Sequence, residues 1–166
     1  MKETLYTIPL TDAFHANDEC PLCFVEREVE QDLLDLVLGS SSSYMESDMR
    51  EMTDKAGFCR AHFKKMFDYG NSLGNAWILK TMYMRHIEEM DKEFKNFKPD
   101  SVQRSGLFKK ANASSNSIVD WINKRESTCF ICDSVNKTFN AYMKTFFTMY
   151  ELSLIHISEP TRLRCI

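Results

Sequence analysis

Apolar residues recur along most of the chain at intervals of three and four, which is the spacing of one face of an α-helix. This pattern predicts helices over residues 22–38, 44–55, 59–69, 73–97, 118–124 and about 129–150. Strict alternation of apolar and polar residues, which is the pattern of a half-buried strand, is almost absent. The sequence therefore predicts an all-α fold of about six helices.

The longest predicted helix, residues 73–97, carries an apolar stripe with the 3-4 spacing of a packing face. The stripe consists of Ala76, Leu79, Tyr83, Ile87, Met90, Phe94 and Phe97. We expect this stripe to face the core, with a seam between two copies of the chain as the alternative. Residues 1–19 contain Pro9 and no helical repeat, so we expect them to be irregular, with a short extended piece at residues 5–8.

Composition changes divide the chain into predicted segments. Residues 1–99 form a first unit with two metal-binding motifs, and Pro99 ends its last helix. Residues 100–117 are rich in Ser, Asn and Lys and are predicted to be a connector. Residues 118–151 are predicted to begin a second, truncated unit. Residues 152–166 resemble a translated sequencing adapter, so we expect them to be a non-native tail and exclude them from fold reasoning.

The composition limits the classes of function. A chain of 166 residues with 43% hydrophobic residues can bury a core without help from a metal. Its net charge of −3 provides no basic field for nucleic acid, so no nucleic-acid partner is expected. Neither a signal peptide nor an apolar run of membrane-spanning length is visible, so we expect a cytoplasmic protein without a membrane partner. In a reducing compartment, closely spaced cysteines favour metal binding or redox chemistry over structural disulfides.

Two short motifs predict a metal site. Cys20 and Cys23 form a Cys-x-x-Cys pair before one predicted helix, and Cys59 and His62 form a Cys-x-x-His pair at the start of another. Backbone N–H groups at a helix start favour thiolates, and three sulfurs with one imidazole are a normal structural zinc shell. The sequence therefore predicts a zinc ion held by these four side chains, at helix starts that the ion clamps together. An alternative is that Cys59 and His62 only pack in the core.

A third motif, Cys129-Phe130-Ile131-Cys132, resembles a second copy of the first. An offset of 109 residues aligns both cysteine pairs and keeps the following apolar residues in register. Three interpretations stay open for Cys129 and Cys132. They are ligands of a second, incomplete site, they join Cys20 and Cys23 in one Cys₄ site, or they are cysteines without a ligand role.

The motifs permit several functions. We expect a structural zinc-binding protein of unknown biochemical role that serves as an intracellular interaction or scaffold module, with an unidentified protein partner. One alternative is a thiol-disulfide oxidoreductase that uses Cys20-Pro21-Leu22-Cys23, although the βαβ pattern of such enzymes does not precede it. Another alternative is an iron–sulfur protein, since cysteine thiolates hold such clusters. Enzymatic activity is uncertain, because no catalytic constellation is readable.

Several segments together resemble a bacterial family of domains of unknown function. The segments are residues 5–9, Cys20-Pro21-Leu22-Cys23, residues 44–46, Gly57-Phe58-Cys59-Arg60-Ala61-His62-Phe63 and Cys129-Phe130-Ile131-Cys132. The resemblance implies duplicated Cys-x-x-Cys and Gly-Phe-Cys-x-x-His-[Phe/Tyr] units, hence two half-sites. The second Cys-x-x-His is missing here, which puts the second site in doubt. The resemblance implies metal ligands and no activity.

Overall fold

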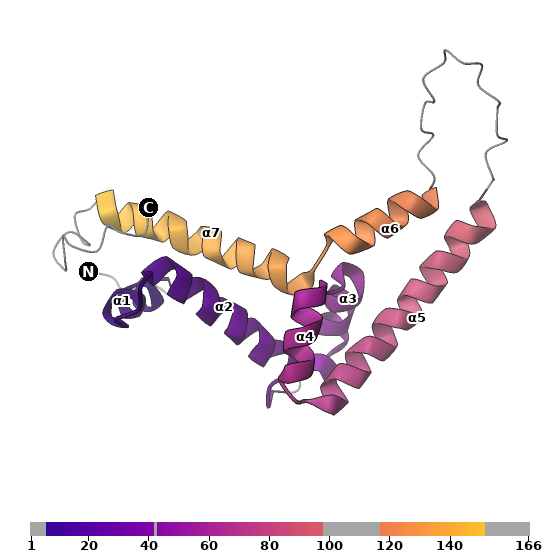
Figure 1. Ribbon diagram of the computed structural model, residues 1–166, viewed down its shortest axis with the longest axis horizontal. Helices are drawn as coiled ribbons and strands as arrows, with labels where there is room; N and C mark the ends of the chain where they lie inside the picture. The colour runs from indigo at the N-terminus through magenta and orange to yellow at the C-terminus, as the bar shows by residue number, and fades with distance from the viewer. Residues whose placement is uncertain (1–5, 42, 98–116, 152–166) are drawn as a thin grey trace, which may run out of the picture. The chain divides into compact units, whose positions relative to one another are not determined.

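The computed structural model describes residues 6–41, 43–97 and 117–151, and this part of the chain is entirely helical (Figure 1). Its elements are α1 (Thr7–His15), α2 (Pro21–Leu38), a short 3₁₀ helix η1 (Ser43–Met45), α3 (Ser47–Ala56), α4 (Arg60–Asp68), α5 (Ser72–Asn96), α6 (Ser117–Ser127) and α7 (Phe130–Glu151). The described residues contain no strand. The all-α prediction is therefore confirmed, with seven α-helices in place of about six. The predicted connector, residues 100–117, lies outside the described ranges except for Ser117, and the predicted tail, residues 152–166, lies wholly outside them.

The additional helix is α1, and the prediction of an irregular, partly extended segment before Cys20 was wrong. Pro9 is the third residue of α1, where a backbone N–H has no partner within the helix, so proline breaks no hydrogen bond there. Tyr6 precedes the helix and forms no side-chain capping hydrogen bond. The sequence therefore lacks the Ser, Thr, Asp or Asn that usually marks a helix start at this position. Leu10 and Ala13 are each only 1% exposed, so burial of one face against α2 stabilises the helix.

The chain divides into two compact units, and the first consists of residues 1–41 together with residues 131–166. Its described helices are α1, α2 and all of α7 except Phe130, which belongs to the second unit. Aromatic side chains join the first of these helices to the last: the ring centroids of Phe14 and Phe146 lie 5.9 Å apart, and those of Tyr6 and Tyr142 lie 5.3 Å apart. The sequence predicted different units, residues 1–99 and 118–151, as copies of a repeat along the chain. Grouping the helices by their contacts does not test such a repeat, so these units stay a prediction.

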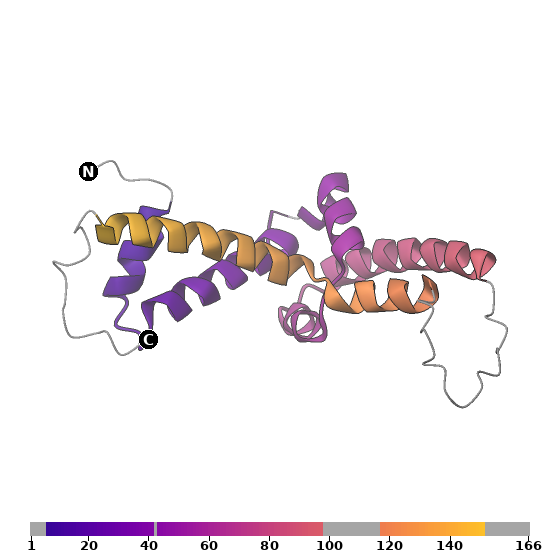
Figure 2. The ribbon, with the colours of Figure 1, turned by 90° about the horizontal axis from the view of Figure 1, so that it is seen from above.

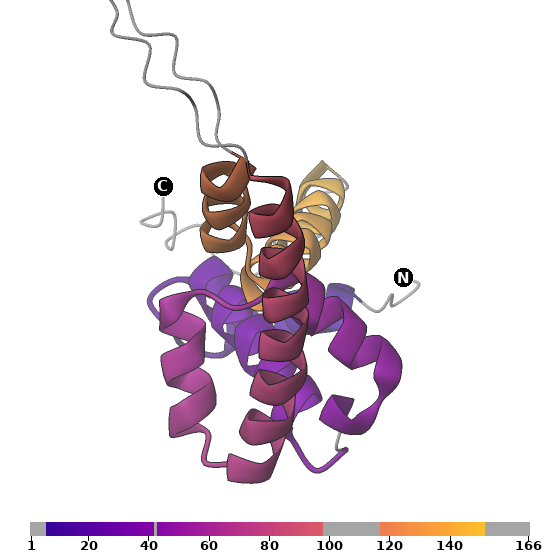
Figure 3. The ribbon, with the colours of Figure 1, turned by 90° about the vertical axis from the view of Figure 1, so that its right-hand side faces the viewer.

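The second unit, residues 42–130, contains η1, α3, α4, α5 and α6. Figure 3 shows α5 with α3 and α4 beside it, and Figure 2 shows α5 next to α6. The core of this unit is formed by Tyr44, Phe58, Met66, Ile78 and Met82. Asp54 is also buried, and its carboxylate accepts a hydrogen bond of 2.9 Å from Thr81 on α5. Desolvation raises the pKa of Asp54, and this hydrogen bond opposes the shift.

A polar network joins α5 to α6 within the second unit. Glu89 on α5 accepts hydrogen bonds from Trp121 and Arg125 on α6, and from Arg85 one turn earlier on its own helix. Burial alone would raise the pKa of Glu89, but these three donors together lower it to about 2. The ionised carboxylate therefore contributes to the packing of α6 on α5.

The apolar stripe of α5 does not form the core face that the sequence predicted. The buried apolar side chains of α5 are Ile78 and Met82, whereas Tyr83, Ile87 and Phe94 are each more than half exposed. The face that carries Ile78, Met82 and Glu89 is occupied by α3 and α6, so the stripe lies to one side of it. In spite of these exposed apolar residues, no helix among the described residues combines the length and hydropathy needed to cross a membrane.

Replacing Glu89 with glutamine tests the network through its pH dependence. Because the pKa of Glu89 lies near 2 in the folded chain, below its ordinary value of 4.5, its stabilisation is present above pH 4.5 and is lost as the pH falls toward 2. We expect Glu89→Gln to lower the free energy of unfolding by about 1–2 kcal/mol at pH 7. The difference from wild type should shrink between pH 4.5 and 2, measured by thermal unfolding followed by circular dichroism.

Glu88→Gln is the matched control, because Glu88 is exposed on the same helix. Its stability difference from wild type should be small and should not follow the pH dependence of the Glu89 variant. A difference between Glu89→Gln and wild type that stays constant from pH 7 to pH 3 would contradict the assigned role of this carboxylate.

Candidate metal centre

A glycine turn between α3 and α4 positions the first two candidate ligands. Gly57 has φ +69° and ψ −165°, a backbone conformation that is essentially restricted to glycine. Phe58 follows, is buried, and packs edge to face on Phe63 with ring centroids 5.6 Å apart. Cys59 then occupies the position just before α4, without a side-chain capping hydrogen bond, and His62 is the third residue of that helix. The turn therefore places a sulfur and an imidazole on the first turn of α4.

The α3–α4 turn also receives hydrogen bonds from the junction between α6 and α7. The hydroxyl of Thr128 donates to the carbonyl of Ala56 at 2.7 Å, and the backbone N–H of Phe130 donates to the carbonyl of Gly57 at 2.9 Å. Arg125 donates to the carbonyl of Lys55 at 2.8 Å, which satisfies one of the last acceptors of α3. These bonds hold Cys129, which precedes α7, next to the turn that carries Cys59.

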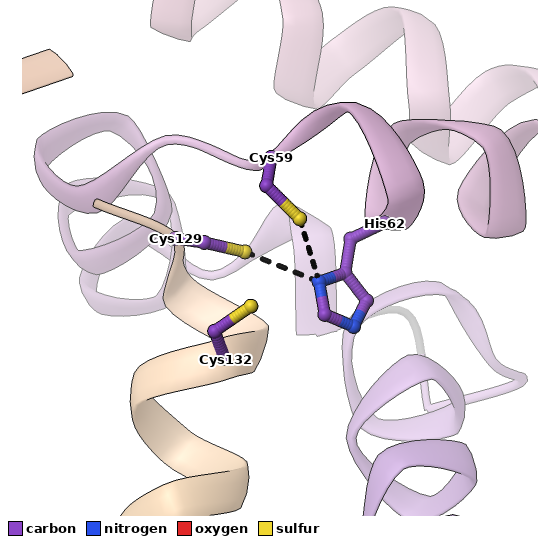
Figure 4. A group of neighbouring side chains, drawn as sticks. All are labelled: Cys59, His62, Cys129 and Cys132. Atoms are coloured by element: carbon purple, nitrogen blue, oxygen red, sulfur yellow. Dashed lines mark hydrogen bonds between the residues drawn. The ribbon is translucent and has the colours of Figure 1, made fainter. Parts of the chain in front are cut away.

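Four side chains converge at the starts of α4 and α7 (Figure 4). Nδ1 of His62 lies 3.1 Å from Sγ of Cys59 and 3.3 Å from Sγ of Cys129. With Sγ of Cys132, on the first turn of α7, all four ligand atoms lie within 4.8 Å of one another. His62 and Cys129 are buried, at 7% and 4% exposure, while Cys59 and Cys132 are half-buried. The group is therefore a compact set of three sulfurs and one nitrogen.

Two sulfurs share one imidazole nitrogen, which suits ligands around a common ion better than hydrogen bonds among the side chains. One imidazole nitrogen has either one lone pair or one N–H, so two sulfurs cannot both form a good hydrogen bond with Nδ1. Around a tetrahedral zinc ion, bond lengths near 2.3 Å to sulfur and 2.0 Å to nitrogen place sulfur about 3.5 Å from nitrogen and about 3.8 Å from another sulfur. The observed distances of 3.1 and 3.3 Å from Nδ1 to the two sulfurs are shorter than this, and the whole group spans up to 4.8 Å, so small side-chain shifts would bring the four atoms around one ion. The Cys₃His group could therefore hold a metal ion.

Two of the four predicted ligands, Cys59 and His62, belong to this group, and they lie with Cys129 and Cys132. The other two, Cys20 and Cys23, lie at the start of α2 in the first unit, where the backbone N–H of Cys23 donates to Sγ of Cys20 at 3.4 Å. The prediction that Cys20 and Cys23 share an ion with Cys59 and His62 is not tested by this arrangement and stays a prediction. The sequence left three interpretations open for Cys129 and Cys132, and none of them paired these cysteines with Cys59 and His62.

Gly57 provides a test of how the turn supports the centre. Nothing lies within 4 Å of a Cβ built on Gly57, so the effect of Gly57→Ala comes from its backbone conformation and not from a clash. We expect this substitution to cost about 1–3 kcal/mol of stability and to weaken metal binding, because it strains the turn that positions Cys59. Thermal unfolding and a competition titration with a chromophoric zinc chelator measure the two effects.

Gly70→Ala is the matched control, since Gly70 also has a positive φ, of +86°, and open space around its Cβ position, but lies at the other end of α4. It should lower stability and leave zinc affinity unchanged. Equal loss of zinc affinity in both variants would show that the turn at Gly57 has no special role in the centre.

The chain was also compared with known proteins. No curated protein and no solved structure matches it. Residues 1–154 match one protein family, described as a family of unknown function, and this span includes all six cysteine and histidine residues of the three motifs. The match confirms the resemblance that the motifs indicated. The chain therefore belongs to the family of unknown function DUF6062.

Proposed function

We propose that this chain is a structural zinc protein in which one ion, held by Cys59, His62, Cys129 and Cys132, joins the start of α4 to the start of α7. The observation that carries the proposal is the convergence of three sulfurs and one imidazole nitrogen within 4.8 Å. In this role the ion stabilises a helical scaffold on which a protein partner binds.

The donor set supports zinc as the ion. Thiolate and imidazole ligands together suit zinc, and a Cys₃His shell is a normal structural zinc site. An iron–sulfur cluster is the weaker alternative, because its ligands surround two or more irons and so stand further apart than ligands around a single ion. Three thiolate ligands also favour a reducing compartment, so we propose the cytoplasm as the location.

The number of ligands supports a structural role over a catalytic one. Catalytic zinc sites combine three protein ligands with a position for water or substrate, whereas four protein ligands fill a tetrahedral shell. Burial of His62 and Cys129 further restricts access to the ion. The chemistry of the site is therefore that of a clamp between two helix starts.

The ion offsets two free-energy costs of folding. Sixty-six residues separate His62 from Cys129, and closing so long a loop costs conformational entropy. Helix α4 has only nine residues, and a helix of that length is marginal without tertiary support. Metal bonds that form only in the folded chain offset both costs, because their binding energy contributes to folding.

The proposed scaffold role is supported by the surface of α5. Leu73, Tyr83, Ile87 and Phe94 are each more than half exposed on this helix. Exposed apolar side chains that gather on one element are typical of surfaces that bind other proteins. A protein partner is therefore more consistent with the molecule than a nucleic acid or a small substrate.

Metal analysis of single variants tests the proposed centre. Each of Cys59→Ser, His62→Ala, Cys129→Ser and Cys132→Ser should lose about one zinc ion per chain relative to wild type, because three ligands hold a structural zinc poorly. Chelation should lower the melting temperature of wild type by roughly 8–16 °C, if free zinc stands about 1,000-fold above its dissociation constant. Inductively coupled plasma mass spectrometry and thermal unfolding give these quantities.

Two double variants distinguish this ligand set from the one predicted from the sequence. Cys129→Ser with Cys132→Ser should lose the ion of the centre, whereas Cys20→Ser with Cys23→Ser should retain it. The reverse result would favour Cys20 and Cys23 as the partners of Cys59 and His62 and would contradict the proposal.

A further inference from the structure

The imidazole of His86 lies where α6 packs beside α5 in the second unit (Figure 2). Its ring contacts Trp121 of α6 edge to face, with ring centroids 6.3 Å apart, and Tyr83 of its own helix at the same distance. Its Nε2 atom is buried without a hydrogen-bond partner, and no other buried side-chain nitrogen or oxygen in the described part of the chain is left in this position. A titratable group is therefore held at a helix interface with one ring nitrogen unsatisfied.

The protonation state of His86 determines how much free energy this position costs. A neutral imidazole can leave Nε2 without a proton, whereas the imidazolium carries an N–H on both ring nitrogens. The cation would therefore bury a charged N–H that has no acceptor, which costs more than burying the bare nitrogen. The packing of α6 on α5 thus fits the neutral ring.

Four charged groups act on His86 from three helices, and they do not remove this cost. They are Arg85 and Glu89 on α5, Asp54 on α3 and Arg125 on α6, while η1 and α4, which also pack on α5, contribute none of these four. Both carboxylates already accept hydrogen bonds from other side chains. Desolvation and, after it, the positive charge of Arg125 lower the pKa of His86, and the two carboxylates oppose this shift only in part.

Helix α6 depends for its position on the side chains around His86. None of its own side chains is fully buried. Trp121 donates to the Glu89 carboxylate at 3.1 Å, and Arg125 donates to the same carboxylate. Arg125 also donates to the carbonyl of Lys55 at the end of α3, at 2.8 Å. A helix with so little buried surface opens more easily than the core of the unit, so a change at His86 alters how often α6 detaches.

We infer that His86 is a pH-sensitive switch for α6: the neutral ring keeps α6 packed on α5, and uptake of a proton by the ring detaches it. The inference goes beyond the proposed zinc site and does not rest on it. Because the pKa of His86 in the folded chain lies below its ordinary value of 6.5, the stabilisation is complete above pH 6.5 and is lost as the pH falls through the folded pKa. The contribution of Glu89 is lost only below pH 4.5, so the two effects fall in different pH ranges.

Hydrogen exchange of the α6 amides, measured by mass spectrometry on the full chain, tests the inference. Rates at about pH 7.5 and about pH 5 are divided by the intrinsic exchange rate at each pH, which gives the opening equilibrium of the helix. In wild type this opening should increase several-fold at the lower pH. In His86→Phe it should be equal at both, because phenylalanine keeps an aromatic ring against Tyr83 and Trp121 but takes up no proton.

His15→Phe is the matched control, because His15 is an exposed histidine on α1 in the first unit. Opening of α6 in this variant should increase at the lower pH as it does in wild type. An equal increase in His86→Phe would show that another group, such as a side chain of the candidate metal centre, responds to the pH, and would overturn the inference.

A titration of wild type followed by nuclear magnetic resonance decides the question even if His86→Phe packs poorly at both pH values. The ring signals of His86 should titrate with a midpoint below pH 6.5, and the indole N–H signal of Trp121 should change with the same midpoint. A midpoint for His86 at or above pH 6.5 would overturn the inference. So would an indole signal that does not follow the titration of His86.

Discussion

The candidate metal centre depends on the contact between the α3–α4 turn and the start of α7. The N–H of Phe130 donates to the carbonyl of Gly57, and from there the side chains of Cys59, His62, Cys129 and Cys132 approach one point. The same region receives Thr128 and Arg125, which satisfy the terminal carbonyls of α3. The backbone hydrogen bonds and the four candidate ligand side chains thus involve the same few residues. A substitution that disturbs the hydrogen bonds is therefore expected to displace the side chains as well.

The geometry of a helix start explains why such short motifs can position two candidate ligands. A residue just before a helix and the third residue inside it lie on one turn, so both side chains can reach one ion. The helix start also presents unpaired N–H groups, which favour the negative charge of thiolates. Each motif therefore needs only a helix with a buried face behind it, and α2, α4 and α7 all bury such a face.

The sequence predicted most helices because their apolar spacing is a local property. It missed α1, since Pro9 resembles a breaker and Tyr6 provides no capping signal. It also singled out both motifs of the Cys₃His group, because each pair is defined within four residues. The sequence does not show which pairs come together in the fold. The separation is 35 residues from Cys23 to Cys59 and 66 residues from His62 to Cys129, and both separations allow the two pairs to meet. The deciding contact is the hydrogen bond from Phe130 to Gly57, which no local pattern encodes.

The distance along the chain between α4 and α7 has a consequence for how the protein is made. During synthesis the first half of the centre leaves the ribosome as Cys59 and His62, with 66 residues still to come before Cys129. Until those residues have emerged, the α3–α4 turn also lacks the donors that Thr128, Phe130 and Arg125 bring to it. The four side chains of the Cys₃His group can therefore come together only late in the synthesis of the chain, and the thiol of Cys59 has to remain reduced until then.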